Sequence, residues 1–246
     1  MHHTPVLEPL RHLPSVTTVP QPQGAQDPTL AVRHDYWQAY YAEHRWALPP
    51  SQFAAFVAGE CPGPRLLIDV GCGQGRDALF FRGLGFHTIG IDASEQAIEY
   101  CRAQLVGLHE LEAQEAFQVR DVRSLAADGD FIARIAPVPK IVYSRFFLHA
   151  IHDAEEAAFL EFAHRACAVE GDVLALEFRT PLDRERSKAT AQHYRRYIDG
   201  SALACRVVEG GRWRLAYQCE GTGLAKFRED DAHVCRLLFI SCASPA

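Results

Sequence analysis

The stretch from Leu66 to Asp77 constrains the fold of this chain more than any other part of the sequence. It begins with Leu66 to Val70, a mostly apolar run of the kind found in fully buried strands. Glycines then occupy positions 71, 73 and 75, and a helix is expected to begin at Ala78. Amide groups at a helix start point outward with partial positive charge, and glycine lets a ligand approach the backbone. The stretch therefore predicts a strand, a turn and a helix that together bind a polar ligand.

Strand and helix patterns alternate through the middle of the chain. Helical patterns begin after Ser94 and at Asp153. Apolar, β-branched runs predict strands at 86–92, 116–121, 139–144 and 173–178. Such alternation indicates a parallel sheet with right-handed crossovers, because each helix returns the chain to the same edge of the strands.

The alternation ends after residue 178. Residues 179–199 are polar and basic, and a helix is expected at 201–209. Residues 213–219 and 234–242 have strand patterns, and we expect them to pair as an antiparallel hairpin at one edge of the sheet. The whole pattern predicts an α/β fold, a Rossmann-like, seven-stranded, mostly parallel sheet with this C-terminal hairpin and with helices on both faces.

The chain is expected to have three parts. Residues 1–28 contain six prolines and little periodicity, which predicts a disordered arm. Residues 29–64 are expected to form a helical lid, in which Tyr36 and Tyr40 belong to an aromatic stripe. Such a stripe either packs on the core or closes over a ligand. Residues 65–246 form the ligand-binding domain, with residues 179–199 as a basic insert.

Composition excludes several function classes. The net charge of −6 is a poor match to nucleic acid, whose binders usually carry a basic excess. No run approaches the roughly 18 apolar residues of a membrane span, and the N-terminus lacks a signal-peptide core. No two of the eight cysteines are spaced as C-x-x-C, which indicates reduced thiols rather than a metal site. We expect a cytoplasmic monomer or homodimer with no metal, nucleic acid or membrane partner.

The glycine spacing separates two cofactor classes. A dinucleotide fingerprint requires G-x-G-x-x-G, whereas this turn reads G-x-G-x-G with Arg76 at the third glycine position. No G-K-[ST] follows, so the turn is not a P-loop. Acids end two of the expected strands, Asp92 the second and Asp121 the third. These acids mark the carboxyl edge of the sheet, where α/β folds bind ligands.

The sequence Asp69-Val70-Gly71-Cys72-Gly73-Gln74-Gly75, the acid Asp92, the pair Asp121-Val122 and the hairpin ending resemble the class I S-adenosylmethionine (SAM) methyltransferases. The resemblance covers residues 65 to 242. It implies SAM as cofactor and S-adenosylhomocysteine as product.

The resemblance also implies roles for single residues. The three glycines would let the backbone approach the amino-acid end of SAM, with Asp69 near its ammonium. Asp92 would accept hydrogen bonds from the ribose hydroxyls, and Asp121 from the adenine amino group beside the Val122 amide. The implied cofactor-binding set is Asp69, Gly71, Cys72, Gly73, Gly75, Asp92, Ala93, Asp121, Val122, Ser144 and Arg145.

Two branches of the class share local patterns with this chain. Residues 71–81, with the upstream Asp-Tyr-Trp, look like the thiopurine and tellurite-type methyltransferases. Residues 143–149, 177–180 and 193–197 look like methyltransferases of surface-polysaccharide gene clusters.

The residues after the fourth strand narrow the acceptor. Ser144-Arg145-Phe146-Phe147 lacks the [DN]-P-P-[YF] of amino-methylating DNA and glutamine enzymes, the Pro-Cys of cytosine C5 enzymes and the acid of metal-dependent catechol enzymes. What remains is a metal-independent methyl transfer to an oxygen or nitrogen of a small molecule, and we expect this molecule to be anionic or sugar-linked. The alternative is an inactive SAM-binding protein that acts as a partner or scaffold.

Histidines and arginines are the candidates for acceptor chemistry. His149 and His193 are candidate general bases, with His152 nearby, because histidine takes up a proton near neutral pH. Each of them could equally be a packed or solvated side chain. The basic insert has two interpretations, a solvated face or a site for an anionic acceptor. The candidate acceptor-binding residues are Tyr36, Tyr40, Arg179, His193, Arg195 and Arg196.

Overall fold

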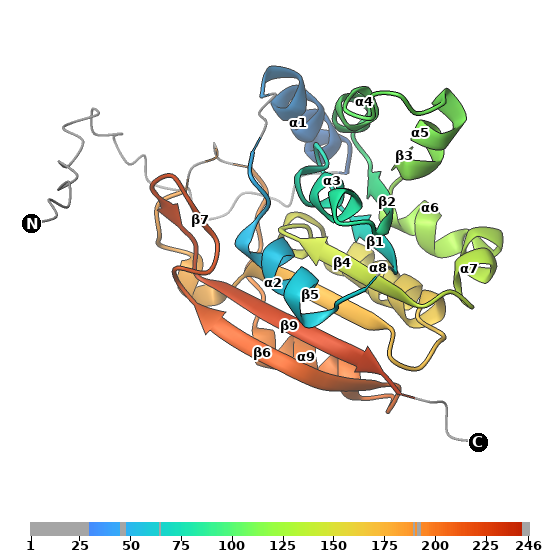
Figure 1. Ribbon diagram of the computed structural model, residues 1–246. Helices are drawn as coiled ribbons and strands as arrows, with labels where there is room; N and C mark the ends of the chain where they lie inside the picture. Colours follow the sequence, from blue (N-terminus) through green and yellow to red (C-terminus); the bar gives the residue numbers. More distant parts are fainter. Residues whose placement is uncertain (1–29, 45–47, 64, 189, 191–192, 243–246) are drawn as a thin grey trace, which may run out of the picture.

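The computed structural model describes residues 30–44, 48–63, 65–188, 190 and 193–242 (Figure 1). The predicted arm at 1–28 lies outside these residues. The strands of the main sheet are β1 Leu66–Val70, β2 His87–Asp92, β3 Phe117–Val119, β4 Lys140–Arg145, β5 Val173–Arg179, β6 Trp213–Gly221 and β9 Val234–Ser241. A separate small hairpin consists of β7 Lys226–Phe227 and β8 Asp230–Asp231.

The strand order in the main sheet is β3-β2-β1-β4-β5-β9-β6. Neighbouring strands from β3 to β5 pair in parallel, whereas β9 pairs antiparallel with both β5 and β6. The predicted seven-stranded, mostly parallel fold with a C-terminal antiparallel hairpin is therefore confirmed.

Helices cover both faces of this sheet (Figure 1). They are α1 Leu30–Glu43, α2 Gln52–Glu60, α3 Arg76–Gly83, α4 Glu95–Ala103, α5 Glu110–Ala116, α6 Val122–Ala127, α7 Gly129–Ile135, α8 Asp153–Ala166 and α9 Gly200–Val208, with short 3-10 helices η1 Leu148–Ala150 and η2 Pro181–Asp183. In the part of the chain that the structure describes, none of these helices is long and apolar enough to cross a membrane.

The alternation of β1 side chains divides the core into two layers. Leu67 is buried with α2 and α3 on one face, whereas Ile68 is buried on the other face with α6 to α9. A buried strand needs apolar side chains on both faces, which explains the mostly apolar run in the sequence. One exception, Asp69, is buried on the α3 face.

Serine caps set the start of two helices, and the one at Ser94 agrees with the helix expected after this residue. The Ser51 side chain accepts the Ala54 amide at 2.9 Å, and the Ser94 side chain accepts the Ala97 amide at 3.2 Å. Helices α5, α6 and α7 and the β7–β8 hairpin were not predicted. Each helix has only six or seven residues, too few to show a helical period in the sequence.

Helix α1 is attached at two points to the edge formed by the strand ends. Its Arg33 forms a buried ion pair of 2.5 Å with Glu155 at the start of α8. Its Gln38 side chain accepts from the Ser94 hydroxyl at 2.6 Å and the Gln96 amide at 3.1 Å, at the start of α4. The helix therefore bridges α4 and α8 across this edge.

Candidate functional site

A cavity of about 860 Å³ lies at the carboxyl ends of the parallel strands. Its lining includes the last residues of β1 to β5, namely Val70, Asp92, Val119, Arg145 and Arg179. Strands β2 and β4 lie on opposite sides of β1 in the sheet, so the cavity lies where the strand order reverses. Open α/β sheets bind their ligands at such points.

The cavity has two sides of different chemistry. The glycine side is lined by Gly71, Cys72, Gly73, Gln74, Asp92, Ala93, Ser94, Val119, Asp121 and Val122. The arginine side is lined by Arg145, Phe146, Phe147, His149, Arg179, Thr190, His193, Arg195, Ala225, Phe227 and Asp230. Residues Arg33, His34, Trp37, Tyr40 and Tyr41 of α1 also line the cavity.

Hydrogen bonds fix the glycine turn against β2. The amides of Gly71 and Cys72 both donate to the Ile91 carbonyl, at 2.8 and 3.0 Å. Gly71 and Gly73 have φ angles of 78° and 52°, in the left-handed region that favours glycine. A Cβ at Gly71 would lie 2.5 Å from the Phe147 ring. Only glycine fits this backbone at this distance.

Asp92 is held with one backbone amide on each carboxylate oxygen. Its Oδ2 accepts from the Gly73 amide and its Oδ1 from the Ser94 amide, both at 2.9 Å. Burial raises the pKa of Asp92, although these two amides lower it. Each carboxylate oxygen can accept about two hydrogen bonds, so both oxygens keep capacity for a ligand that carries two neighbouring hydroxyls.

Asp121 caps α6 at the far end of the glycine side. Its Oδ1 accepts from the amides of Arg123 and Ser124, at 2.9 and 3.0 Å, and its Oδ2 from the Ser124 hydroxyl. Although partial burial raises the pKa of Asp121, the bonds from Ser124 and Arg123 lower it overall. The carboxylate is therefore charged and oriented beside the Val122 backbone.

Three predicted cofactor residues lie behind the cavity lining. Asp69 is 3% exposed, and burial together with Asp77 raises its pKa well above the ordinary value. The Ser144 hydroxyl donates to the Val70 carbonyl at 3.0 Å, and Gly75 begins α3 against Cys101. These residues support the turn from behind.

Phe146 organises the arginine side from a strained backbone position. It follows β4 with a φ of 57°, which is rare for a bulky residue and found where surrounding structure compels it. The guanidinium carbons of Arg145 and Arg179 lie 4.3 and 5.2 Å from its ring centroid. The ring also meets His149 edge-on at 5.1 Å.

His149 lies at the base of the arginine side and is 4% exposed. Its Nδ1 accepts the Arg179 backbone amide at 3.3 Å, which assigns the imidazole proton to Nε2. Burial lowers the pKa of His149 well below its ordinary value, and the cations Arg179 and Arg195 lower it further. At neutral pH His149 is therefore uncharged, with an N–H donor at Nε2.

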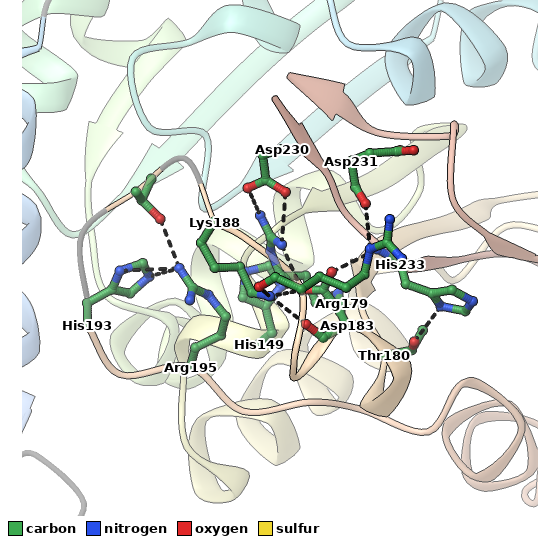
Figure 2. Close-up of polar contacts among 12 residues, drawn as sticks. His149, Arg179, Thr180, Asp183, Lys188, His193, Arg195, Asp230, Asp231 and His233 are labelled. Carbon is green, nitrogen blue, oxygen red and sulfur yellow. Dashed lines mark hydrogen bonds and ion pairs between the residues drawn. The ribbon is translucent and has the colours of Figure 1, made fainter. Parts of the chain in front are cut away.

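The arginines of the basic insert differ in their partners (Figure 2). Arg179 pairs with Asp183 and Asp230, both at 2.7 Å, so two carboxylates balance its charge. Arg196 pairs with Asp153 and Glu156 and is not among the lining residues of the cavity.

Arg195 lies on the arginine side with a different set of partners (Figure 2). It donates to Thr190 at 2.9 Å and lies 3.2 Å from a ring nitrogen of His193. Within the described residues no carboxylate forms an ion pair with it, and its Nε is buried without a partner. Burial and the like charge of Arg179 lower its pKa.

The aromatic stripe of α1 reaches the same region. Tyr40 and Trp37 line the cavity, whereas Tyr36 stacks on His193 with ring centroids 4.6 Å apart and is not part of the lining. His152 contacts the Tyr194 hydroxyl at 2.9 Å and lies outside the lining. The structure thus brings Tyr40, His193 and Arg195 together on one cavity.

Several lining residues were not predicted from the sequence. Trp37 and Tyr41 are aromatic residues beside the predicted Tyr36 and Tyr40, and aromatic character alone does not show which of the four side chains reaches the cavity. Phe227 and Asp230 lie in the connection between β6 and β9, which has no strand or helix period in the sequence. Within the described ranges, no group of three or more His, Cys, Asp or Glu side chains is arranged to hold a metal ion.

The fold and the geometry of the glycine side define the class I SAM-dependent methyltransferases, whose methyl donor is SAM. Residues 39–208 match the family described as "Methyltransferase domain", and the chain belongs to this family.

A thiopurine S-methyltransferase of Azotobacter vinelandii is 28% identical over 109 residues, which cover 42% of this chain and 50% of that protein. The chain therefore spans about half the length of this curated relative.

Solved structures share the fold at low sequence identity. A SAM-dependent methyltransferase of Anabaena variabilis superposes with a TM-score of 0.60 at 16% identity, covering 88% of this chain and 98% of that one. A structure described under "Conversion of a Disulfide Bond into a Thioacetal Group during Echinomycin Biosynthesis" gives 0.61 at 21% identity, covering 87% and 94%. These similarities establish the fold.

The polar groups of the glycine side match the chemistry of SAM. Asp92 has two oriented oxygens that would accept from the ribose hydroxyls, and Asp121 with the Val122 amide would offer an acceptor and a donor to the adenine edge. The glycine turn lets the backbone approach the amino-acid end. Bound SAM would supply an electrophilic methyl group, and the turn and the two acids are the groups that would hold its nucleoside.

Proposed function

We propose that this protein transfers the methyl group of SAM to a small molecule that carries an anionic group. The observation that supports this proposal is Arg195, a cation on the arginine side without a carboxylate partner among the described residues. A buried charge is costly unless it is paired, so a ligand with the opposite charge stabilises this site.

The other insert arginines take a different part in the proposal. Arg179 forms part of the cavity wall, and its positive charge is paired with Asp183 and Asp230. Arg196 lies outside the cavity lining, and its charge is paired with Asp153 and Glu156. An anionic acceptor would therefore bind Arg195, with the rings of Tyr40 and Phe227 beside it. The aromatic rings favour a partly apolar molecule over a fully polar sugar.

Helix α1 serves as the lid of this site. Trp37, Tyr40 and Tyr41 of this helix line the cavity. The helix is held to α4 by hydrogen bonds and to α8 by an ion pair, and both kinds of contact can break and re-form. In this proposal the acceptor and SAM enter when these contacts open. We also propose that the protein is cytoplasmic, works as a monomer or homodimer, and does not bind nucleic acid, in keeping with its net charge of −6.

A second candidate function is that of an inactive SAM-binding scaffold. Thermal unfolding with SAM, S-adenosylhomocysteine and NAD in parallel tests the donor, because a ligand that binds the folded state raises the Tm. We expect a rise with the first two only. Transfer of label from methyl-labelled SAM to any small molecule excludes the scaffold function, and a Tm rise with NAD alone contradicts the proposal as a whole.

A further inference from the structure

We propose that the methyl acceptor is a carboxylate oxygen, ionised before it binds, so that the product is a methyl ester and no side chain acts as general base. This inference rests on the proposed function and names its substrate class. It follows from how each proton-accepting group on the arginine side is engaged.

His149 is the histidine buried at the base of the arginine side, and its acceptor nitrogen is occupied. The Arg179 amide donates to Nδ1, so the remaining nitrogen, Nε2, carries the proton and donates. As a base it would have to become an imidazolium between the guanidinium groups of Arg179 and Arg195, and these cations disfavour that charge.

The other proton acceptors on this side are also engaged (Figure 2). Both ring nitrogens of His193 lie within 3.4 Å of the Arg195 guanidinium. Both oxygens of the Asp230 carboxylate accept from the Arg179 guanidinium, at 2.7 and 3.4 Å. The Tyr40 phenol is protonated at neutral pH, because burial raises its pKa.

The charge of this region favours an acceptor that is already negative. Arg145 is fixed by Glu177 at 2.9 Å and lines the cavity with its guanidinium over Phe146. Arg195 lies on the same side without a carboxylate partner in the described part of the chain. Two arginines and a neutral Nε2–H donor bind and orient a carboxylate, whereas a hydroxyl or an ammonium would still need a group to take its proton.

The reaction then balances without proton transfer. A lone pair of the carboxylate oxygen forms a bond to the methyl carbon, the bond from that carbon to sulfur breaks, and its electron pair remains on sulfur. The carboxylate becomes a neutral ester, and the sulfonium becomes the neutral thioether of S-adenosylhomocysteine. Alignment of oxygen, carbon and sulfur is the remaining requirement.

The test uses methyl-labelled SAM, the full chain and four probes of matched shape: benzoate, phenol, thiophenol and aniline. A low-molecular-weight metabolite extract is tested alongside. Methyl esters release volatile labelled methanol in mild base, whereas ethers, thioethers and N-methyl products do not. We expect base-labile label from benzoate or from the extract. Base-stable label in an anionic product overturns the carboxylate assignment and leaves the proposed function standing. Label in the aniline product alone, or the absence of transfer to every probe and to the extract with SAM still bound, overturns both.

The pH dependence gives a second readout. A carboxylate with a pKa of about 4 is ionised throughout the range from about pH 6 to about pH 9, so kcat should be flat there. The variant His149→Asn, whose amide oxygen can accept the Arg179 amide, should lower kcat through lost positioning but keep the flat profile. An acidic limb in the native protein that disappears in this variant would identify His149 as a base and contradict the inference.

Discussion

The hydroxyl oxygen of Tyr41 lies 2.6 Å from the position that a Cβ on Gly73 would occupy. Helix α1 and the glycine turn therefore meet at van der Waals distance, and no side chain fits between them. Burial, followed by the charge of Asp92, raises the pKa of Tyr41 well above the ordinary value, so the hydroxyl stays protonated at this contact.

The variant Gly73→Ala should bind SAM at least about tenfold more weakly, because the new methyl group meets Tyr41 and the left-handed backbone costs alanine about 1 kcal/mol. Isothermal titration calorimetry measures this change. The matched control is Gly85→Ala, which has a φ of 88° but no atom within 4 Å of the new Cβ. It should lose stability without losing SAM affinity.

Adding Tyr41→Phe to Gly73→Ala should restore part of the SAM affinity, because the nearest contact atom is then absent. Equal affinity in the single and double variants would show that the contact between α1 and the turn has no influence on binding.

The variant Asp92→Asn should weaken SAM binding by about 10- to 100-fold, the range for a lost hydrogen bond to a charged group. An amide group also places an N–H opposite either the Gly73 amide or the Ser94 amide, which disturbs the turn. The control Glu99→Gln removes one exposed charge from α4 and should bind as the native protein does. Native affinity in Asp92→Asn would mean that the nucleoside binds elsewhere.

Arg195 and Arg196 form a matched pair for the acceptor. Arg195→Ala should raise the acceptor KM by about 10- to 100-fold and leave the SAM affinity unchanged, since it removes a charged hydrogen-bond donor from the arginine side. Arg196→Ala breaks ion pairs with Asp153 and Glu156 and should affect stability more than KM. Steady-state kinetics with both variants decide between the two arginines, and an unchanged KM in Arg195→Ala contradicts its role.

His149 should make the protein sensitive to mild acid. In the unfolded chain this histidine titrates near about pH 6.5, whereas burial lowers its pKa in the folded chain. Below about pH 6.5 the unfolded state binds a proton that the folded state excludes, so stability is complete above this pH and decreases as the pH falls, by at most about 1.4 kcal/mol per pH unit.

The variant His149→Asn should therefore lose less stability than the native protein between about pH 7.5 and about pH 5.5, as measured by urea unfolding. The matched control is His87→Asn, which replaces an exposed histidine at the start of β2. Identical slopes for His149→Asn and the native protein would place the titration of His149 at its ordinary value.

The sequence predicted those parts of the molecule that depend on neighbouring residues. The strand ending at Val70, the glycines and the acid at the end of β2 form a local pattern, and the structure places Gly71, Gly73 and Asp92 on one cavity. The parallel part of the sheet follows from the alternation of strands and helices. The binding roles of these residues stay predictions.

The arginine side could not be predicted in the same way. Arg179, Arg195 and Arg196 have the same chemistry in the sequence, and their difference comes from partners such as Asp230 and Glu156, which lie far away along the chain. Likewise, only the tertiary structure shows that the Arg179 amide occupies Nδ1 of His149. Long-range pairing decides which cation faces the cavity.

The ion pairs of Arg179 have an evolutionary consequence. These ion pairs connect η2, which follows β5 in the sequence, to β8, which lies in the connection from β6 to β9, at the wall of the arginine side. Residues 70–122 form the glycine side without either segment. Exchange of both segments together could alter the choice of substrate and spare the nucleoside site. Exchange of one segment alone would leave the buried Arg179 guanidinium with one carboxylate partner instead of two. Substrate range in relatives of this chain should therefore diverge by paired replacement of these two segments.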